Sequence, residues 1–250
     1  MNIGILGIGV IGSAVAQGFL KDGDLEHKFY ISPRGENRSQ ALEKEYSQVV
    51  RCKSNQDVLD ASEVIIVSVL PQKGLEILSE LEFKSNHHVI NLMSDKKLDQ
   101  IEAVIGKTKS LTHMVPLSFI QNREGPIAIY PQNKFVIDLV NKLGHVVAVD
   151  DVNKIESIAA ITGLMTSYYR LLNDVANWGE NNGLTYEESK DYTTNFFEAL
   201  SKNASSGDLN ILSNEMTPEG LNEYALKYLD ENMTFDKWIN TLDPMLKRVK

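Results

Sequence analysis

Cysteine is almost absent from this chain of 250 residues, because Cys52 is the only one. A single cysteine cannot form an intramolecular disulfide, which favours a protein of the reducing cytoplasm. The five histidines show no paired spacing typical of metal ligands, and no cysteine cluster accompanies them, so we expect no metal site. The chain opens without a basic segment followed by an apolar run, and therefore no signal peptide is predicted.

Long apolar runs are also missing, since the strongest one, residues 64–70, is far too short to span a bilayer. Basic residues are outnumbered, with 25 Lys and Arg against 34 Asp and Glu and a formal net charge of −9. This charge makes neither nucleic acid nor an anionic membrane an expected partner. The content of 42% hydrophobic and 24% charged residues is that of a globular protein, long enough for one large domain or two ordinary ones.

The first 150 residues alternate strand-like and helix-like segments, the pattern of a mostly parallel sheet covered by helices. The expected strands are short and rich in Val and Ile, and they cover residues 2–6, 28–32, 49–52, 64–69, 88–92, 110–114, 127–130 and 145–149. Helical periodicity lies between them over residues 11–20, 39–46, 75–81 and 135–143. Residues 1–150 are therefore predicted to form a doubly wound α/β domain.

Residues 151–250 have a different character and are predicted to form an all-helical domain. A helix over residues 154–182 has apolar side chains on nearly every face, so another surface must bury it. A second subunit is an attractive cover, which predicts a homodimer or a larger homo-oligomer. Gly183 ends this helix, and Thr185 with Glu188 forms a capping box that begins the next. Further helices are expected over residues 188–205, 219–231 and 235–248, with N-terminal signals at Thr217-Pro218 and Thr234.

A GxGxxG motif, Gly7-Ile8-Gly9-Val10-Ile11-Gly12, stands between the first expected strand and the first expected helix. In that context Gly7 makes the tight turn, and Gly9 lets the backbone approach a pyrophosphate at the helix N-terminus. Gly12 allows the helix to pack closely on the strand. The alternative is a glycine-rich turn in another kind of α/β protein. The strand–turn–helix context favours a dinucleotide-binding Rossmann domain.

The end of the second expected strand carries no carboxylate, although NAD-binding proteins usually place an Asp or Glu there to hold the ribose hydroxyls. Ser32, Arg34 and Asn37 stand in that region instead. A hydroxyl, a guanidinium and an amide bind a 2′-phosphate well, whereas a carboxylate would repel it. NADP(H) is therefore the expected cofactor. The alternative for Arg34 is a solvated loop cation, and Arg38 is interpreted as a helix-surface residue.

The order of these motifs resembles that of the pyrroline-5-carboxylate reductase family over the whole chain. The matching segments are Ser-Pro-Arg at residues 32–34, Ser54-Asn55 before a helix, and Val67-Ser68-Val69-Leu70-Pro71-Gln72. The resemblance implies that Asn55 contacts the adenosine ribose and that Val69, Leu70 and Pro71 border the cofactor. Residues 162–169 sit where the family carries Ser-Gly-Ser-Gly-Pro-Ala-Tyr-Phe, at the start of a long dimer-forming helix. Residues 217–222 sit where it carries Ser-Pro-Gly-Gly-Thr-Thr.

The chain also departs from the family pattern. Leu70 replaces the family's lysine, residues 91–94 lack the Ala-Gly that borders the nicotinamide pocket, and residues 115–118 replace Met-Pro-Asn-Thr. The two threonines that hold the pyrroline carboxylate in the family align with Leu221 and Asn222. The resemblance thus implies a divergent branch that uses NADPH to reduce the C=N bond of a cyclic imine. Whether that imine yields L-proline is left open by these departures.

The resemblance further implies a substrate site between the sheet edge and the long helix of a partner subunit. We expect Thr166 and Asn222 to orient the substrate, with a proton supplied through a hydroxyl or an ordered water. The residues expected to contact the substrate are Met93, His113, Pro116, Thr162 and Tyr168. The alternatives are that Thr166 and Tyr168 pack in the helix interface and that His113 is a structural hydrogen-bonding residue.

Two other functions remain open from the sequence. A β-hydroxyacid dehydrogenase shares the architecture, but its helical half relies on a lysine followed four residues later by an asparagine, and no lysine lies between Lys154 and Lys190. A non-catalytic NADP(H)-binding protein would keep the cofactor groove without the substrate site, which the altered substrate loop would allow.

Overall fold

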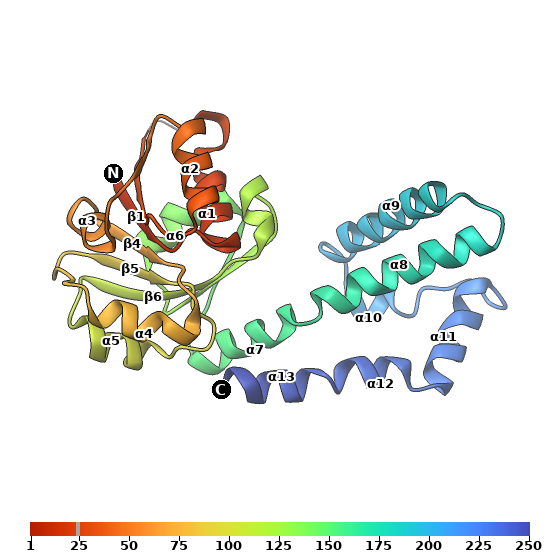
Figure 1. Cartoon of the computed structure of the whole chain (residues 1–250). Coiled ribbons are helices and arrows are strands. Elements are labelled where there is room, and N and C mark those ends of the chain that lie inside the picture. The colour runs from red at the N-terminus through yellow and green to blue at the C-terminus, as the bar shows by residue number, and fades with distance from the viewer. Residues whose placement is uncertain (24–25) are drawn as a thin grey trace. The chain divides into compact units, whose positions relative to one another are not determined.

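The structure, a computed structural model, describes residues 1–23 and 26–250 (Figure 1). The chain divides into two compact units. The first consists of residues 1–159 with residues 249–250, and the second of residues 160–248.

The first unit is built on an eight-stranded sheet in the order β3-β2-β1-β4-β5-β6-β7-β8. All neighbouring strands are parallel except β6 and β7, which are antiparallel. The strands are β1 Asn2–Leu6, β2 Lys28–Ile31, β3 Val49–Arg51, β4 Val64–Val67, β5 His88–Asn91, β6 Ser110–Val115, β7 Pro126–Tyr130 and β8 His145–Ala148. Each of the eight predicted strands is present, and the central strands β4 and β5 are buried throughout, as expected of a sheet that is covered on both faces.

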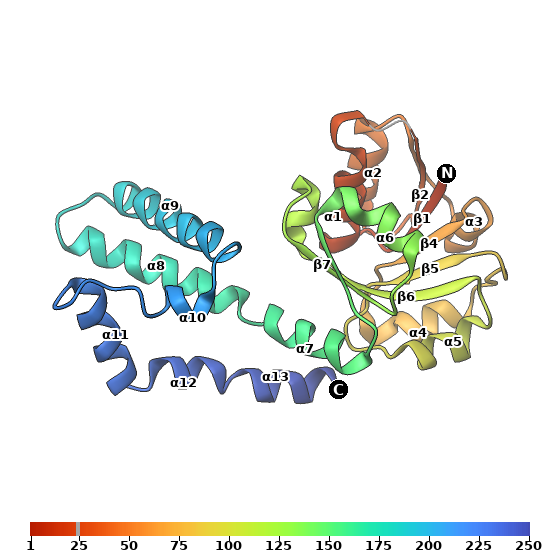
Figure 2. The same cartoon turned by 180° about the vertical axis from the view of Figure 1, so that it is seen from behind.

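Helices cover both faces of this sheet, as expected of a doubly wound domain (Figures 1 and 2). On one face α1 (Val10–Leu20), α2 (Glu36–Glu45) and α6 (Lys134–Val140) contribute to one apolar cluster. On the other, α3 (Asn55–Asp60), α4 (Pro71–Ser79) and α5 (Leu98–Ile105) contribute to a second cluster. The helix indicated after Ser54-Asn55 is α3, whereas α5 was not predicted from the sequence. The 3-10 turns are η1 Lys21–Gly23, η2 Ser118–Asn122 and η3 Asn141–Leu143.

The second unit is helical, which confirms the predicted fold class. Helix α7 (Val152–Thr162) passes into it from the first unit. The others are α8 Met165–Asn181, α9 Tyr186–Ala204, α10 Leu209–Leu212, α11 Leu221–Glu231, α12 Thr234–Ile239 and α13 Leu242–Val249. Helices α8 and α9 form a hairpin (Figure 1). The predicted capping box is present at its turn, where the Glu188 N–H donates to Thr185 Oγ1 and the Thr185 N–H donates to the Glu188 carboxylate.

Four details of the helical prediction were wrong. Gly220, and not the predicted Thr217-Pro218, is the N-cap of α11. The helix expected over residues 154–182 is broken at Gly163 and Leu164, because α7 ends at Thr162 and α8 begins at Met165. The helix expected over residues 235–248 is divided into α12 and α13. Thr234 is the first residue of α12 rather than its cap, since Met233 precedes the helix with a left-handed φ of 52°.

Several large apolar side chains of the helical unit are exposed. Trp178 of α8 is 68% exposed and Leu221 of α11 is 89% exposed, and Ile161, Tyr169 and Leu171 are also exposed. The expectation that a second subunit covers the long helix stays a prediction. Among the described residues, no helix combines the length and the apolar character needed to cross a bilayer.

Candidate functional site

The three glycines of the GxGxxG motif occupy three different environments. Gly7 has a left-handed φ of +91°, and a Cβ atom at this position would meet the Ser68 carbonyl oxygen at 2.6 Å. A Cβ at Gly12 would collide with the Gly7 carbonyl oxygen, so α1 can approach the end of β1 only with glycine there. A Cβ at Gly9 would meet nothing within 4 Å. Gly7 therefore makes a tight turn, Gly12 allows close packing of α1 on β1, and the space beside Gly9 is open.

The open position lies at the N-terminus of α1. Gly9 is the N-cap residue, no side chain caps the helix, and no acidic residue stands in its first turn. The first N–H groups of a helix lack intrahelical partners and carry a partial positive charge. The space beside Gly9 and these amides fit the diphosphate of a dinucleotide, which supplies the oxygen acceptors and the negative charge.

Ser32 joins the glycine loop to two other segments. Its hydroxyl accepts a hydrogen bond from the Gly7 N–H at 3.0 Å and donates one to Asn55 Oδ1 at 2.8 Å. Only 1% of Ser32 is exposed. The structure thus brings together three residues that the sequence assigned to the cofactor. Here the hydroxyl of Ser32 holds the loop, and a direct contact of Ser32 with a phosphate stays a prediction.

The loop after β2 lies against the glycine loop. Gly35 has a φ of +77°, and a Cβ on it would collide with the Ile8 carbonyl oxygen. Arg34 and Asn37 are exposed. Within residues 1–23 and 26–250, the Arg34 guanidinium has no hydrogen-bond or ion-pair partner. A free guanidinium beside the dinucleotide loop is available to an anionic ligand.

Arg51 supports this loop and was not predicted from the sequence. Its Nε donates to Ser39 Oγ at 3.0 Å and its Nη2 donates to the Pro33 carbonyl oxygen at 3.1 Å. Because Arg51 ends β3, these bonds fix residues 33–39 to the sheet. Only the pairing of β2 with β3 brings Arg51 there, so no local signal could have identified it.

The segment after β4 passes beside the glycine loop. A Cβ on Gly7 would meet the backbone nitrogen of Val69 at 3.0 Å. Leu70 is 72% exposed and precedes Pro71, the first residue of α4. These three residues therefore stand at the carboxyl edge of the sheet near Gly7, where a dinucleotide would pass.

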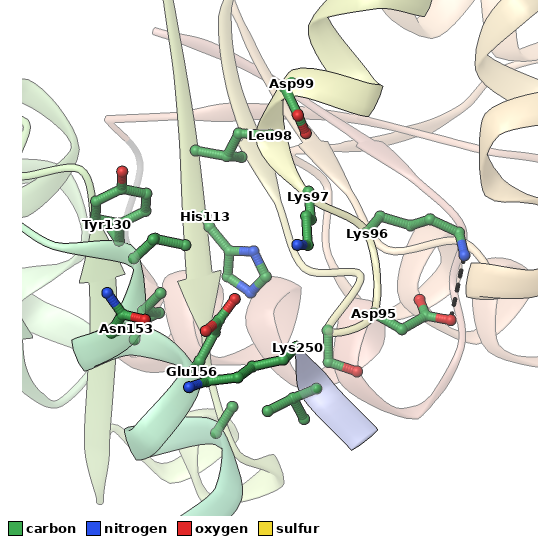
Figure 3. A pocket seen from close by; sticks show the side chains of 15 residues that line it. Asp95, Lys96, Lys97, Leu98, Asp99, His113, Tyr130, Asn153, Glu156 and Lys250 are labelled. Carbon is green, nitrogen blue, oxygen red and sulfur yellow. Dashed lines mark hydrogen bonds and ion pairs between the residues drawn. The ribbon is translucent and has the colours of Figure 1, made fainter. Parts of the chain in front are cut away.

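A cavity of about 460 Å³ lies in the first unit at the same edge of the sheet (Figure 3). Its lining includes Ser94 and Lys97 of the loop after β5, His113 of β6, Tyr130 of β7, and Asn153 and Glu156 of α7. Figure 3 shows the His113 ring directed into the space between these side chains. Met93 lies in the apolar core instead, with its sulfur against Gly74, and Pro116 is buried after the end of β6.

His113 is the most strongly perturbed titratable group near the cavity. Burial lowers the pKa of its imidazole to about 4, since desolvation disfavours the charged form. Its Nδ1 lies 3.3 Å from the side-chain nitrogen of Asn91. His113 is therefore a neutral hydrogen-bonding group at physiological pH rather than an acid.

The remaining predicted residues belong to the second unit or to its boundary. Thr162 ends α7, Thr166 is exposed in the first turn of α8, and Asn222 is exposed in the first turn of α11. Tyr168 is half-buried, with its ring edge-to-face with that of Phe197 at 6.1 Å. In the described part of the chain, no three His, Cys, Asp or Glu side chains lie together as a metal site would require.

The lowered pKa of His113 predicts a pH dependence of stability. The unfolded chain binds a proton near pH 6.5 and the folded one only near pH 4, so this group destabilises the fold as the pH falls through that window. Between pH 7 and pH 4, unfolding by urea should show wild type losing about 3 kcal/mol more than His113→Gln. Equal losses in the two proteins would show that His113 is not held neutral.

The chain is similar to known oxidoreductases in sequence and in fold. Residues 2–95 match the family model described as NADP oxidoreductase coenzyme F420-dependent. A pyrroline-5-carboxylate reductase of Aquifex aeolicus (strain VF5) is 22% identical over 243 residues, which cover 92% of this chain and 89% of that protein. The crystal structure of 1-pyrroline-5-carboxylate reductase from Streptococcus pyogenes has a TM-score of 0.86 at 19% identity, covering 100% of this chain and 98% of the other. Plasmodium falciparum pyrroline carboxylate reductase with NADP bound has a TM-score of 0.85 at 19% identity, with coverages of 100% and 97%.

Proposed function

We propose that this chain, which is similar to pyrroline-5-carboxylate reductases in sequence and in fold, is an NADPH-dependent oxidoreductase that reduces the C=N bond of a cyclic imine. The observation that carries the proposal is the preformed glycine loop, with Gly9 open at the uncapped N-terminus of α1. A loop of this shape binds the diphosphate of a nicotinamide dinucleotide.

The form of the cofactor is inferred from the loop after β2. Arg34 is exposed and unpaired among the described residues, and position 32 is a serine rather than an Asp or Glu. This arrangement favours a 2′-phosphate, and the NADP oxidoreductase family that matches residues 2–95 supports the same choice. The residues that we propose for the cofactor are Gly7, Ile8, Gly9, Val10, Ile11, Gly12, Ser32, Arg34, Asn37, Asn55, Val69, Leu70 and Pro71.

Bound NADPH supplies a hydride, and a cyclic iminium ion is already electrophilic at carbon. The chain therefore needs only to bind and orient the imine and to exclude water from it. We assign the substrate surroundings to His113, Thr162 and Tyr168, and not to Met93 and Pro116, which are buried away from the cavity. Thr166 and Asn222 would orient the imine, and either could hold a water that protonates the nitrogen when the imine binds as the neutral base.

We further propose that residues 1–150 bind the cofactor and that residues 151–250 form the substrate and dimerisation domain of a homodimer. Support comes from the exposed apolar side chains of α8 and α11, among them Trp178 and Leu221. A monomer seldom leaves so many large apolar residues in water. The single cysteine agrees with a cytoplasmic enzyme.

The imine specificity is tested by following NADPH absorbance with five- and six-membered cyclic imines, each with and without a carboxylate. Turnover is expected with at least one of them, and replacing Thr166 by Val should lower kcat/KM by about tenfold or more. The neighbouring Ser167→Ala variant, which lies outside the proposed site, is the matched control. No turnover with any imine by a protein that binds NADPH would favour the non-catalytic alternative.

The phosphate preference is tested by replacing Arg34 with Asp. Loss of a charge-assisted hydrogen bond and introduction of a negative charge should weaken NADPH binding about 10–100-fold and leave NADH binding nearly unchanged. Arg38→Asp changes the charge by the same amount on the surface of α2 and serves as the control. Calorimetric titration gives both affinities, and equal weakening of NADPH and NADH would rule out the phosphate role.

The homodimer is tested by placing a charge on its proposed interface. Trp178→Glu should shift the protein from dimer to monomer in light scattering coupled to gel filtration, because a buried unpaired carboxylate is costly. Glu180→Gln, on the same helix, should leave the mass unchanged. A wild-type protein that is monomeric at high concentration would contradict the proposal.

A further inference from the structure

Asn91, His113 and Tyr130 form a row across three neighbouring strands. Asn91 of β5 is in register with His113 of β6, and His113 is in register with Tyr130 of β7. Residues in register on adjacent strands direct their side chains to the same face of a sheet. Asn91 is the last residue of β5, and His113 lies two residues before the end of β6. His113 and Tyr130 line the cavity of about 460 Å³ (Figure 3).

The amide of Asn91 has a fixed orientation. Its Oδ1 accepts the backbone N–H of Met93 at 3.0 Å, and its Nδ2 donates to the Met93 carbonyl oxygen at 3.1 Å. In the reversed amide, Nδ2 would face the Met93 N–H, donor against donor, and Oδ1 would face the Met93 carbonyl oxygen, acceptor against acceptor. Nδ2 must therefore be the atom that faces His113. The remaining hydrogen of Nδ2 is directed to His113 Nδ1 at 3.3 Å.

This contact determines the tautomer of His113. Because Asn91 donates, Nδ1 accepts, and the proton of the neutral imidazole resides on Nε2. Burial keeps the ring uncharged, with a pKa of about 4. His113 therefore offers the cavity a hydrogen-bond donor of fixed direction that does not release or take up a proton near pH 7.

The other groups of the cavity indicate what this donor would bind. The charged side chains that line it are Asp95, Asp99 and Glu156 against Lys96, Lys97 and Lys250, so they balance in sign. A balanced lining and a neutral donor favour an uncharged acceptor such as an amide carbonyl. The position agrees, because a dinucleotide held at the end of β1 extends its second half across the ends of the following strands.

We propose that His113, held in its Nε2–H tautomer by Asn91, donates a hydrogen bond to the carboxamide oxygen of the nicotinamide ring. The proposal rests on the proposed function and narrows the role given there to His113. It makes His113 a group that orients the ring and excludes it as the proton donor to the imine. Asn91 acts through His113 and is a positioning residue.

Binding of two nucleotides tests the proposal without turnover. Adenosine 2′,5′-bisphosphate contains the adenosine half of NADPH and lacks the nicotinamide. His113→Leu should weaken NADPH binding by about 5–20-fold, as expected for one lost hydrogen bond, and leave bisphosphate binding within about twofold of wild type. His113→Gln, which retains a donor, should recover part of the loss.

The tautomer gives an independent readout in the protein without ligand. Nitrogen-15 NMR of labelled histidine should show the His113 proton on Nε2. In Asn91→Asp the carboxylate accepts from Nδ1, so the proton should move to Nδ1 and NADPH affinity should fall although His113 is present. Asn91→Leu, which adds no buried charge, should lower the NADPH affinity without imposing the Nδ1–H form.

Three results would overturn the proposal. The first is a proton on Nδ1 of wild-type His113, and the second is an equal NADPH affinity of wild type and His113→Leu. The third is a His113→Leu variant in which the KM for the imine rises while the NADPH affinity does not change, which would assign the donor to the substrate. If wild type binds neither NADPH nor the bisphosphate, the proposed function fails together with this inference. Binding of both by wild type, with no effect of His113→Leu, removes the inference alone.

Discussion

The shape of the glycine loop depends on the buried hydroxyl of Ser32. This one group accepts the N–H of Gly7 and donates to Asn55, and it thereby ties the end of β1 to the end of β2 and the start of α3. An amide that lost its acceptor inside the fold would destabilise the turn by about 1–3 kcal/mol. Because Arg51 fixes the adjoining residues to β3, the proposed phosphate loop rests on the sheet as well.

A second set of fixed polar contacts stands at the other end of the proposed cofactor path. There the side-chain amide of Asn91 is hydrogen-bonded to the Met93 backbone and to the His113 ring. In the same way, the amide oxygen of Asn55 accepts a hydrogen bond from the Ser32 hydroxyl. Both pairs lie where strands of a parallel sheet end, and this edge is where such sheets bind ligands. In the proposed function, the rigid sheet thus prepares both halves of the dinucleotide site before the cofactor arrives.

The sheet could be predicted from the sequence because each strand is a short Val- and Ile-rich run between turn residues, and the GxGxxG motif identified the first turn. Helix α5 was not predicted from the sequence. Arg51 and the Asn91–His113 pair could not be found, since both depend on which strands are neighbours and in which register. The break at Gly163 likewise depends on packing, because Met245 of α13 lies against that glycine.

Replacing Gly9 by alanine tests the central claim most directly, namely that the loop is preformed around an open site for a diphosphate. The backbone at Gly9, with φ −81° and ψ −161°, is allowed for alanine, and the added methyl would meet nothing within 4 Å. The account predicts an unchanged melting temperature and NADPH binding weakened by at least about tenfold in calorimetry, because the methyl fills the space that a phosphate needs. A Gly9→Ala protein that binds NADPH as tightly as wild type would contradict it.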